Sequence, residues 1–356
     1  MTFLIAAAGT GGHVFPGLAV GEALTIRGVR REDVLFVGGD RLEATVYPEA
    51  GFPFLGLELM GLQRSLSVRN LSLPRVVWRA RDLIAGQMVE RGVEVALGMG
   101  GYVTVPAALA ARRIKVPLLI AEQNAAAGLA NRVASRWAAR SFTSFPDTAG
   151  LPKGEWVGNP VRRALADFDR ESLRPGALAR YDLEPDRPVL GVFGGSLGAA
   201  SINAVIVRLV ETWQGEPIQV LHLTGDADLR AGPPTRAVVW RRKPFEERME
   251  AFYAACDLVV ARAGGGVAEL TVTGTPSILV PGRFGSTGHQ ESNAAFLDKA
   301  GAAIVLAQDR IEALPELVGE ILSSPERLES MRARALEIAK PDAAITIADA
   351  MLETVQ

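Results

Sequence analysis

The sequence predicts an α/β protein with two Rossmann-like domains, each built on a parallel sheet. Short apolar segments alternate with helical segments, which is typical of a parallel sheet covered by helices on both faces. The order of strand, glycine loop and helix at residues 3–24 recurs at 188–213. The length of 356 residues allows each domain its own core. We therefore expect two similar domains that face each other across a cleft.

Residues 1–160 carry the segments expected to form the first domain. The apolar run 3–8 is predicted to be a buried strand, and Pro16 is expected in the first turn of the next helix. Strands are expected at 3–8, 34–37, 54–57, 93–97, 118–121 and 141–143. Helices are expected at about 16–28, 41–50, 73–91, 103–114 and 128–139.

Residues 161–340 are expected to form the second domain. The polar, proline-containing segment 167–187 is predicted to be a linker, and the glycine loop 194–198 precedes a helix at 199–213. Strands are expected at 188–193, 218–223, 237–239, 258–261, 277–280 and 303–306. The segment 341–356 is predicted to be a helix that packs back onto the first domain.

The amino-acid composition limits which classes of function and which cellular locations are expected. The formal net charge of -2 provides no overall basic field for nucleic acid. The single cysteine, Cys256, excludes an internal disulfide and a cysteine-based zinc site, and no motif indicates another metal or a cofactor. No signal peptide and no run of about 18 apolar residues is visible. We therefore expect a cytoplasmic protein, with attachment to a membrane surface left open.

Glycine loops at strand ends indicate a ligand that carries phosphate groups. In the loop 9–16, backbone N–H groups at the start of a helix can approach an anion, aided by the helix dipole. Further glycine loops occur at 98–102, 194–198 and 262–266, each between a strand and a helix. Ligands of such sheets bind at the carboxyl ends of the strands, so the loops together favour a diphosphate.

Two other phosphate-binding classes fit less well. The chain has no P-loop of the form Gly-x-x-x-x-Gly-Lys-Ser/Thr. Val14 occupies a position where the dinucleotide-binding fingerprint requires glycine or alanine. Asp40 and Glu43, near the end of the second strand, nevertheless keep an NAD-dependent oxidoreductase open as an alternative.

Three groups are candidates for chemistry or binding. His13 lies in the first glycine loop, where the helix dipole favours the neutral imidazole that can accept a proton from a hydroxyl; acceptor binding or loop bracing is the alternative. Glu269 can accept hydrogen bonds from a ribose diol, or it is a solvated helix residue. The segment 289–293 suits sugar hydroxyls or, alternatively, helix capping.

The segment Leu66–Ile84 interleaves arginine with leucine, valine and tryptophan, and a second basic and aromatic group surrounds Trp137. A basic amphipathic segment can lie on an anionic membrane surface. The alternative is an ordinary helix with a solvated arginine face.

Several motifs occur together and in order along the chain. They are Gly9-Thr10-Gly11-Gly12-His13-Val14-Phe15-Pro16, Gly98-Met99-Gly100-Gly101-Tyr102, Glu122-Gln123-Asn124, Gly158-Asn159-Pro160-Val161-Arg162, Gly194-Gly195-Ser196-x-Gly198-Ala199, and Gly274-x-Pro276 with His289-Gln290-x-x-Asn293. With this set the chain resembles, from Phe3 to beyond Gly301, the MurG family of bacterial N-acetylglucosaminyltransferases.

The resemblance implies a GT-B fold and a metal-independent, inverting transfer of GlcNAc. The donor would be UDP-GlcNAc, and the acceptor the MurNAc 4-hydroxyl of undecaprenyl-diphosphoryl-MurNAc-pentapeptide (lipid I), giving lipid II for peptidoglycan synthesis. Because the acceptor is lipid-linked, the family implies a peripheral location on the cytoplasmic face of the cell membrane, held through Leu66–Ile84. Other cell-wall synthesis proteins are possible partners. A UDP-GlcNAc epimerase or a UDP-sugar-binding protein of related fold is the alternative.

The resemblance also implies roles for single residues, with His13 as the base. The residues implied for UDP-GlcNAc are Thr10, Gly11, Gly12, Asn124, Arg162, Ser196, Phe245, Glu246, Gly265, Gly266, Glu269 and Gln290. Those implied for the acceptor are Gly101, Tyr102 and Glu122. Relatives commonly have glutamine in place of His289, and their counterpart of residues 262–269 is one residue longer.

Overall fold

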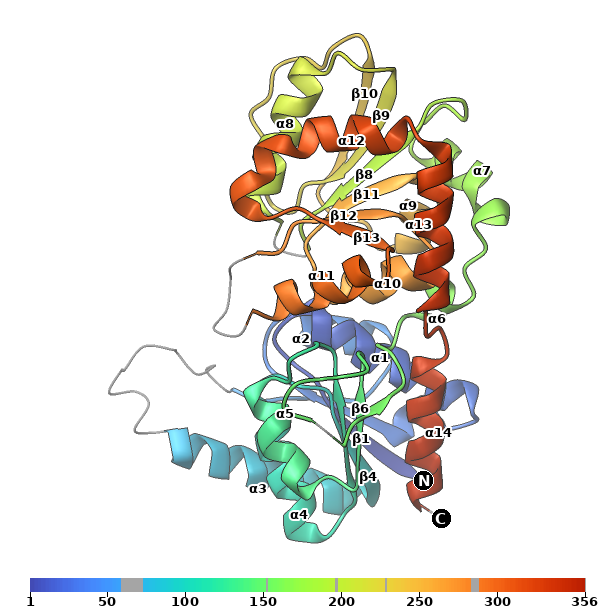
Figure 1. Cartoon of the computed structure of the whole chain (residues 1–356). Coiled ribbons are helices and arrows are strands. Elements are labelled where there is room, and N and C mark those ends of the chain that lie inside the picture. Colours follow the sequence, from blue (N-terminus) through green and yellow to red (C-terminus); the bar gives the residue numbers. More distant parts are fainter. Residues whose placement is uncertain (59–72, 152, 196–197, 228, 283–287, 356) are drawn as a thin grey trace. The chain divides into compact units, whose positions relative to one another are not determined.

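A computed structural model describes residues 1–58, 73–151, 153–195, 198–227, 229–282 and 288–355. The chain divides into two compact units (Figure 1). The first comprises Met1–Arg162 and Pro341–Gln356, and the second comprises Arg163–Lys340. Each unit is built on one sheet whose strands pair in parallel. In the described residues, no helix combines the length and the apolar character that crossing a bilayer requires.

The sheet of the first unit has the strand order β3-β2-β1-β4-β5-β6-β7. Its strands are β1 (Thr2–Ala6), β2 (Val34–Gly38), β3 (Phe54–Gly56), β4 (Val93–Gly98), β5 (Leu118–Glu122), β6 (Arg140–Thr143) and β7 (Glu155–Trp156). The strands predicted for this half are confirmed. The strand β7 is not among those predicted, because a strand of two residues has no periodicity that could reveal it.

Helices cover both faces of this sheet. They are α1 (Gly11–Ile26), α2 (Leu42–Glu49), α3 (Leu73–Arg91), α4 (Thr104–Ile114), α5 (Leu129–Ala134) and α14 (Ala343–Val355), with 3-10 turns at Arg31–Asp33 and Ser135–Trp137. Phe3 and Ile5 of β1 pack with α1, α2 and α14. Leu4 and Ala6 point to the other face and pack with α3 and α4. This two-sided burial explains why the strands are apolar at nearly every position.

The first helix begins earlier than the sequence suggests. It starts at Gly11, so Pro16 lies inside α1, and the expectation that this proline occupies the first turn is wrong. Two glycines at a helix start obscure it, because glycine is a poor helix former. As a result His13 lies in the first turn of α1, at the positive end of its dipole.

The sheet of the second unit has the strand order β10-β9-β8-β11-β12-β13. Its strands are β8 (Val189–Phe193), β9 (Ile218–Leu223), β10 (Val238–Lys243), β11 (Leu258–Ala261), β12 (Ser277–Leu279) and β13 (Ala303–Val305). Its helices are α6 (Arg163–Ala166), α7 (Arg170–Arg180), α8 (Ala200–Thr212), α9 (Met249–Ala255), α10 (Gly266–Val272), α11 (His289–Lys299), α12 (Leu314–Leu322) and α13 (Pro325–Glu337), with a 3-10 turn at Gln308–Ala313. The strands predicted for this half are confirmed, although β10 is longer than expected.

The predicted linker at 167–187 is wrong, because most of it forms α7. Asp169 caps this helix by accepting hydrogen bonds from the N–H groups of Glu171 and Ser172. Arg170 and Arg174 form ion pairs with Asp257, at 2.7 and 3.1 Å. The polar residues that resemble a linker in sequence therefore anchor a helix next to the start of β11.

Candidate active site

The first unit brings three loops with predicted site residues to one edge of its sheet. The loops after β1, β4 and β5 meet there because parallel strands end at the same edge. Thr10 precedes α1, and its hydroxyl oxygen lies 3.3 Å from Nδ1 of His13. This contact orients the imidazole from the loop side.

The loop after β4 lies directly against His13. A Cβ atom at Gly100 would lie 2.7 Å from Cδ2 and 2.9 Å from Nε2 of the His13 ring, and Gly100 has φ +95°. The next residue, Gly101, has φ +78°, and its Cβ would lie 2.3 Å from the carbonyl oxygen of Ala8. Only glycine fits both positions without strain, so these glycines let two loops close around the imidazole.

Glu122 holds the loop after β5 in place. Its side chain is 2% exposed. Oε1 accepts hydrogen bonds from the backbone and side-chain nitrogens of Asn124, at 3.0 and 3.1 Å. Oε2 accepts from Gly128 N–H at 3.0 Å and from Asn131 Nδ2 at 2.8 Å. The carboxylate thus points inward and orients Asn124, the partly exposed residue of the pair.

Tyr102 pairs with the carboxylate of Glu43, which in the sequence supports only the alternative of an NAD-dependent oxidoreductase. Its hydroxyl donates to Oε1 of Glu43 at 3.3 Å. Burial raises the pKa of Tyr102 to about 12, and the charge of Glu43 and their hydrogen bond act in the same direction. Tyr102 therefore remains a neutral hydrogen-bond donor at physiological pH. The sequence signal for this contact is an acidic residue four positions after Gly39, in the first turn of α2.

Arg162 lies at the end of the first unit, over the ring of Phe15. Its guanidinium carbon is 5.4 Å from the ring centroid, which is a cation–π contact. Phe15 follows His13 by two residues on α1, so the arginine lies near the predicted site from within the same unit.

In the second unit the loop after β8 is shaped for close backbone packing. A Cβ atom at Gly194 would lie 2.3 Å from the backbone nitrogen of Ala199. Gly198 has φ +72°, and its Cβ would lie 2.8 Å from the carbonyl oxygen of Thr224. Gly198 and Ala199 lead into the first turn of α8, and backbone N–H groups at such a helix start can bind an anion. The predicted diphosphate contact, Ser196, lies outside the described residues.

Gly265, Gly266 and Glu269 are brought together at the start of α10. Gly265 precedes the helix, Gly266 begins it and Glu269 lies in its first turn. The hydroxyl of the fully buried Tyr253 donates to Oε2 of Glu269 at 2.8 Å. Tyr253 therefore fixes the direction of this carboxylate, a role that no local sequence pattern reveals.

Gln290 and Asn293 tie α11 to the ends of neighbouring strands. Gln290 Oε1 accepts from the N–H group of Gly282 at 2.7 Å, beyond β12. Asn293 is fully buried, and its Nδ2 donates to the carbonyl of Ala263 at 3.1 Å, beyond β11. These contacts place the start of α11 beside the glycine loop of α10.

Arginine and lysine side chains hold Glu246 in place, and the neighbouring Phe245 is half-exposed. The Glu246 carboxylate, 2% exposed, accepts hydrogen bonds from Lys243, Tyr181, Arg180 and the backbone of Arg248, at 2.5 to 3.1 Å. Burial acts to raise its pKa, but these hydrogen bonds, that from Lys243 foremost, outweigh burial and lower the pKa to about 2.

Replacement of Glu246 by glutamine is expected to destabilise the protein by about 2 kcal/mol at pH 7. The pKa is lower in the folded than in the unfolded chain, where it is about 4.3. The stabilisation is therefore fully present above about pH 5, and it decreases as the pH falls toward 2. Urea unfolding of both proteins between pH 3 and 7 measures this, and a difference that does not change with pH would contradict it.

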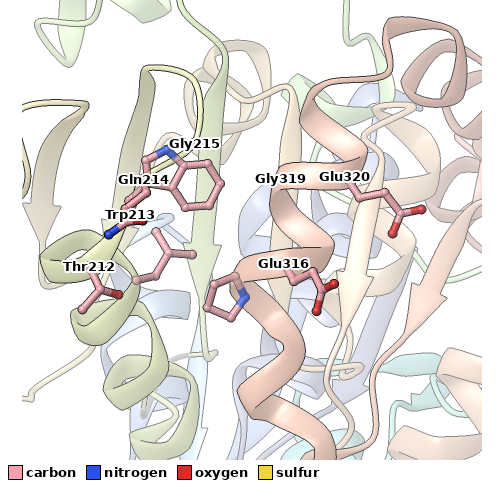
Figure 2. Close-up of a pocket in the computed structure, with 9 residues that line it drawn as sticks. Thr212, Trp213, Gln214, Gly215, Glu316, Gly319 and Glu320 are labelled. Carbon is pink, nitrogen blue, oxygen red and sulfur yellow. The ribbon is translucent and has the colours of Figure 1, made fainter.

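Two further features of the described structure bear on the site. Among the described residues, histidine, cysteine, aspartate and glutamate form no group of three that could hold a metal ion. A pocket of about 450 Å³ lies in the second unit, between the end of α8 near Trp213 and α12 near Glu316 (Figure 2). None of the predicted site residues lines this pocket.

Comparison with protein families matches both halves of the chain. The glycosyltransferase family 28 N-terminal domain matches residues 3–143. The glycosyltransferase family 28 C-terminal domain matches residues 189–347.

Two curated relatives match over nearly their whole length. The UDP-N-acetylglucosamine--N-acetylmuramyl-(pentapeptide) pyrophosphoryl-undecaprenol N-acetylglucosamine transferase of Halorhodospira halophila is 40% identical, over 98% of this chain and 96% of the relative. The protein of the same name from Salinibacter ruber is 39% identical, over 97% of this chain and 94% of the relative.

Solved structures share the fold. Acinetobacter baumannii MurG superposes with a TM-score of 0.78 and 26% identity, covering 99% of both chains. A UDP-GlcNAc 2-epimerase from Neisseria meningitidis, bound to UDP-GlcNAc, superposes with a TM-score of 0.67 over 99% of this chain and all of that chain. Its sequence identity of 15% limits this second likeness to the fold.

Proposed function

The chain belongs to glycosyltransferase family 28, and we propose that it transfers GlcNAc from UDP-GlcNAc to the MurNAc 4-hydroxyl of lipid I, giving lipid II. The observation that carries this proposal is the 40% identity, over 98% of the chain, to a transferase named for this reaction. The sequence-based resemblance to the MurG family and the expected GT-B fold are both confirmed.

We assign the two substrates to different units. The second unit would hold the donor, because the start of α8 offers N–H groups for a diphosphate and Glu269, fixed by Tyr253, offers a carboxylate for the ribose. The backbone at Phe245 and Glu246 would contact uracil. The first unit would hold the acceptor, near Gly101 and Tyr102.

The remaining donor contacts are proposed for the sugar and the diphosphate. Gly265, Gly266 and Gln290 would contact the GlcNAc sugar from the second unit. Thr10, Gly11, Gly12 and Asn124 would contact it from the first. Glu122 would act through Asn124, which its carboxylate orients. Ser196 and Arg162 would lie near the diphosphate, where Arg162 would offset negative charge.

The proposed reaction is a single displacement. The 4-hydroxyl oxygen of MurNAc forms a bond to C1 of GlcNAc while the bond from C1 to the β-phosphate oxygen breaks, and UDP leaves with the bonding electrons. The hydroxyl proton passes to the neutral imidazole of His13. Negative charge grows on the leaving diphosphate, where the helix N-terminus of α8 would stabilise it.

We propose that α3 attaches the first unit to an anionic membrane surface. The predicted segment Leu66–Ile84 is described only from residue 73 onward. In that part Trp78 is 51% exposed, the guanidinium carbon of Arg81 lies 4.1 Å from its ring centroid, and Leu83 is 54% exposed. An exposed tryptophan beside arginines suits the boundary between headgroups and water.

Combined replacement of Trp78 and Arg79 by serine is expected to weaken binding to anionic vesicles about tenfold. Co-sedimentation with vesicles that contain phosphatidylglycerol measures this. A matched control replaces Leu336 and Arg334 of α13, an exposed apolar residue and an exposed arginine in the second unit, and should bind like the wild type. Unchanged binding of the Trp78 and Arg79 variant would overturn this role for α3.

UDP release in a coupled assay tests the proposed function. The proposal predicts UDP only when both UDP-GlcNAc and a lipid I analogue are present. An epimerase of related fold would instead convert the sugar nucleotide without any acceptor. A UDP-sugar-binding protein would bind UDP-GlcNAc and release nothing.

A further inference from the structure

Glu43 is a fully buried carboxylate in the first turn of α2. Its Oε1 accepts hydrogen bonds from Gly39 N–H at 3.0 Å, from Gly9 N–H at 3.3 Å and from the Tyr102 hydroxyl at 3.3 Å. These donors come from the loops that follow β2, β1 and β4. One oxygen atom thus joins three strand ends of the first unit, and two of them, those of β1 and β4, lead into loops with predicted site residues.

Two glycines beside Glu43, Gly38 and Gly39, leave room for its side chain and for the Tyr102 hydroxyl. A Cβ atom at Gly38 would lie 2.6 Å from its Cγ, and a Cβ at Gly39 would lie 1.7 Å from the Tyr102 hydroxyl oxygen. Any larger residue at these positions would displace the carboxylate or the phenol. The contact between Glu43 and Tyr102 therefore depends on both glycines of the β2 loop.

Removing this carboxylate would leave its donors without a partner. Its second oxygen, Oε2, is buried and makes no hydrogen bond within the described structure, so the residue interacts through Oε1 alone. A buried N–H group without an acceptor is costly, and the loops would move to regain one. The loop at Gly9 leads within four residues to His13, so such a shift would reach the proposed base.

We propose that Glu43 is a positioning residue for the acceptor side of the transfer. It fixes the Gly9 loop and the Tyr102 hydroxyl relative to each other, so that the acceptor meets both in a set geometry. This inference rests on the proposed function. It adds a residue that never touches substrate but determines where Tyr102 and the loop before His13 lie.

Steady-state kinetics with separate readouts for each substrate test the proposal. Glu43→Ala should raise KM for a lipid I analogue, or lower kcat, by about tenfold or more, because three donors lose their acceptor. The dissociation constant of UDP, which binds the second unit, should stay within about twofold. Glu43→Gln keeps an oxygen that can accept the same hydrogen bonds and should recover most of the lost activity.

Three further variants keep the test decisive. Glu43→Asp withdraws the carboxylate by one methylene. It should change KM for the lipid I analogue, or kcat, less than Glu43→Ala does, and leave the dissociation constant of UDP unchanged. This variant tests the proposal if Glu43→Ala does not fold. Glu49→Ala, an exposed carboxylate on the same helix, is the matched control and should behave like the wild type. Tyr102→Phe should cost less activity in the Glu43→Ala background than alone, because the two act through one contact.

The outcomes separate this proposal from the proposed function. Full activity of folded Glu43→Ala, additive effects with Tyr102→Phe, or a parallel loss of UDP affinity would each overturn the positioning role. Absence of transfer by the wild type would overturn the proposed function and this inference together.

Discussion

Replacement of His13 by alanine is expected to lower kcat by about 10²–10⁴-fold, the usual contribution of a general base. The imidazole lies in the first turn of α1, between Thr10 and the loop at Gly100. Its loss removes the group proposed to accept the proton from the 4-hydroxyl, but leaves the donor groups of the second unit untouched. The dissociation constant of UDP should therefore not change.

Thr25→Ala, near the other end of α1, is the matched control and should retain wild-type kcat. A folded His13→Ala enzyme with near-wild-type kcat would remove His13 from the role of base.

Replacement of Glu269 by alanine is expected to raise the dissociation constant of UDP by about 10- to 100-fold. A carboxylate that accepts hydrogen bonds from a ribose diol contributes about 1.5–3 kcal/mol. Tyr253→Phe should weaken UDP binding in the same direction but less, because it only frees the carboxylate to turn. Isothermal titration calorimetry with UDP measures both changes.

A nucleotide without the ribose 2′-hydroxyl tests the contact itself. The wild type should bind 2′-deoxy-UDP more weakly than UDP, and Glu269→Ala should bind the two about equally. Glu326→Ala, an exposed carboxylate in the first turn of α13, is the matched control. Equal discrimination by wild type and Glu269→Ala would show that Glu269 does not bind the ribose.

The sequence predicts most of the fold because both sheets are parallel and buried on both faces. Strands such as β1 and β8 are short apolar runs followed by glycine, a strong local signal. The start of α1 and the presence of α7 are missed for opposite reasons. Two glycines conceal a real helix start, and the arginines of α7 look solvated until Asp257 is brought next to them.

The sequence predicts some residues of the candidate site and misses others, depending on whether their contacts are local in sequence. His13, the glycine loops and Glu269 are visible because each lies at a strand end or in a helix start that is local in sequence. The buried partners that orient them are not, because Glu43 meets Tyr102 across 59 positions and Tyr253 meets Glu269 across 16. Such contacts depend on packing between elements, which one sequence does not display.

Transfer of radiolabel from UDP-GlcNAc to a lipid I analogue tests the central claim most directly. The wild type is predicted to move the labelled sugar into the lipid fraction only when the analogue is present, with one UDP released per sugar transferred. His13→Ala should bind UDP normally while transferring at a small fraction of that rate. Label that stays with the nucleotide in the presence of the analogue would contradict the assignment of this chain as a lipid-linked N-acetylglucosaminyltransferase.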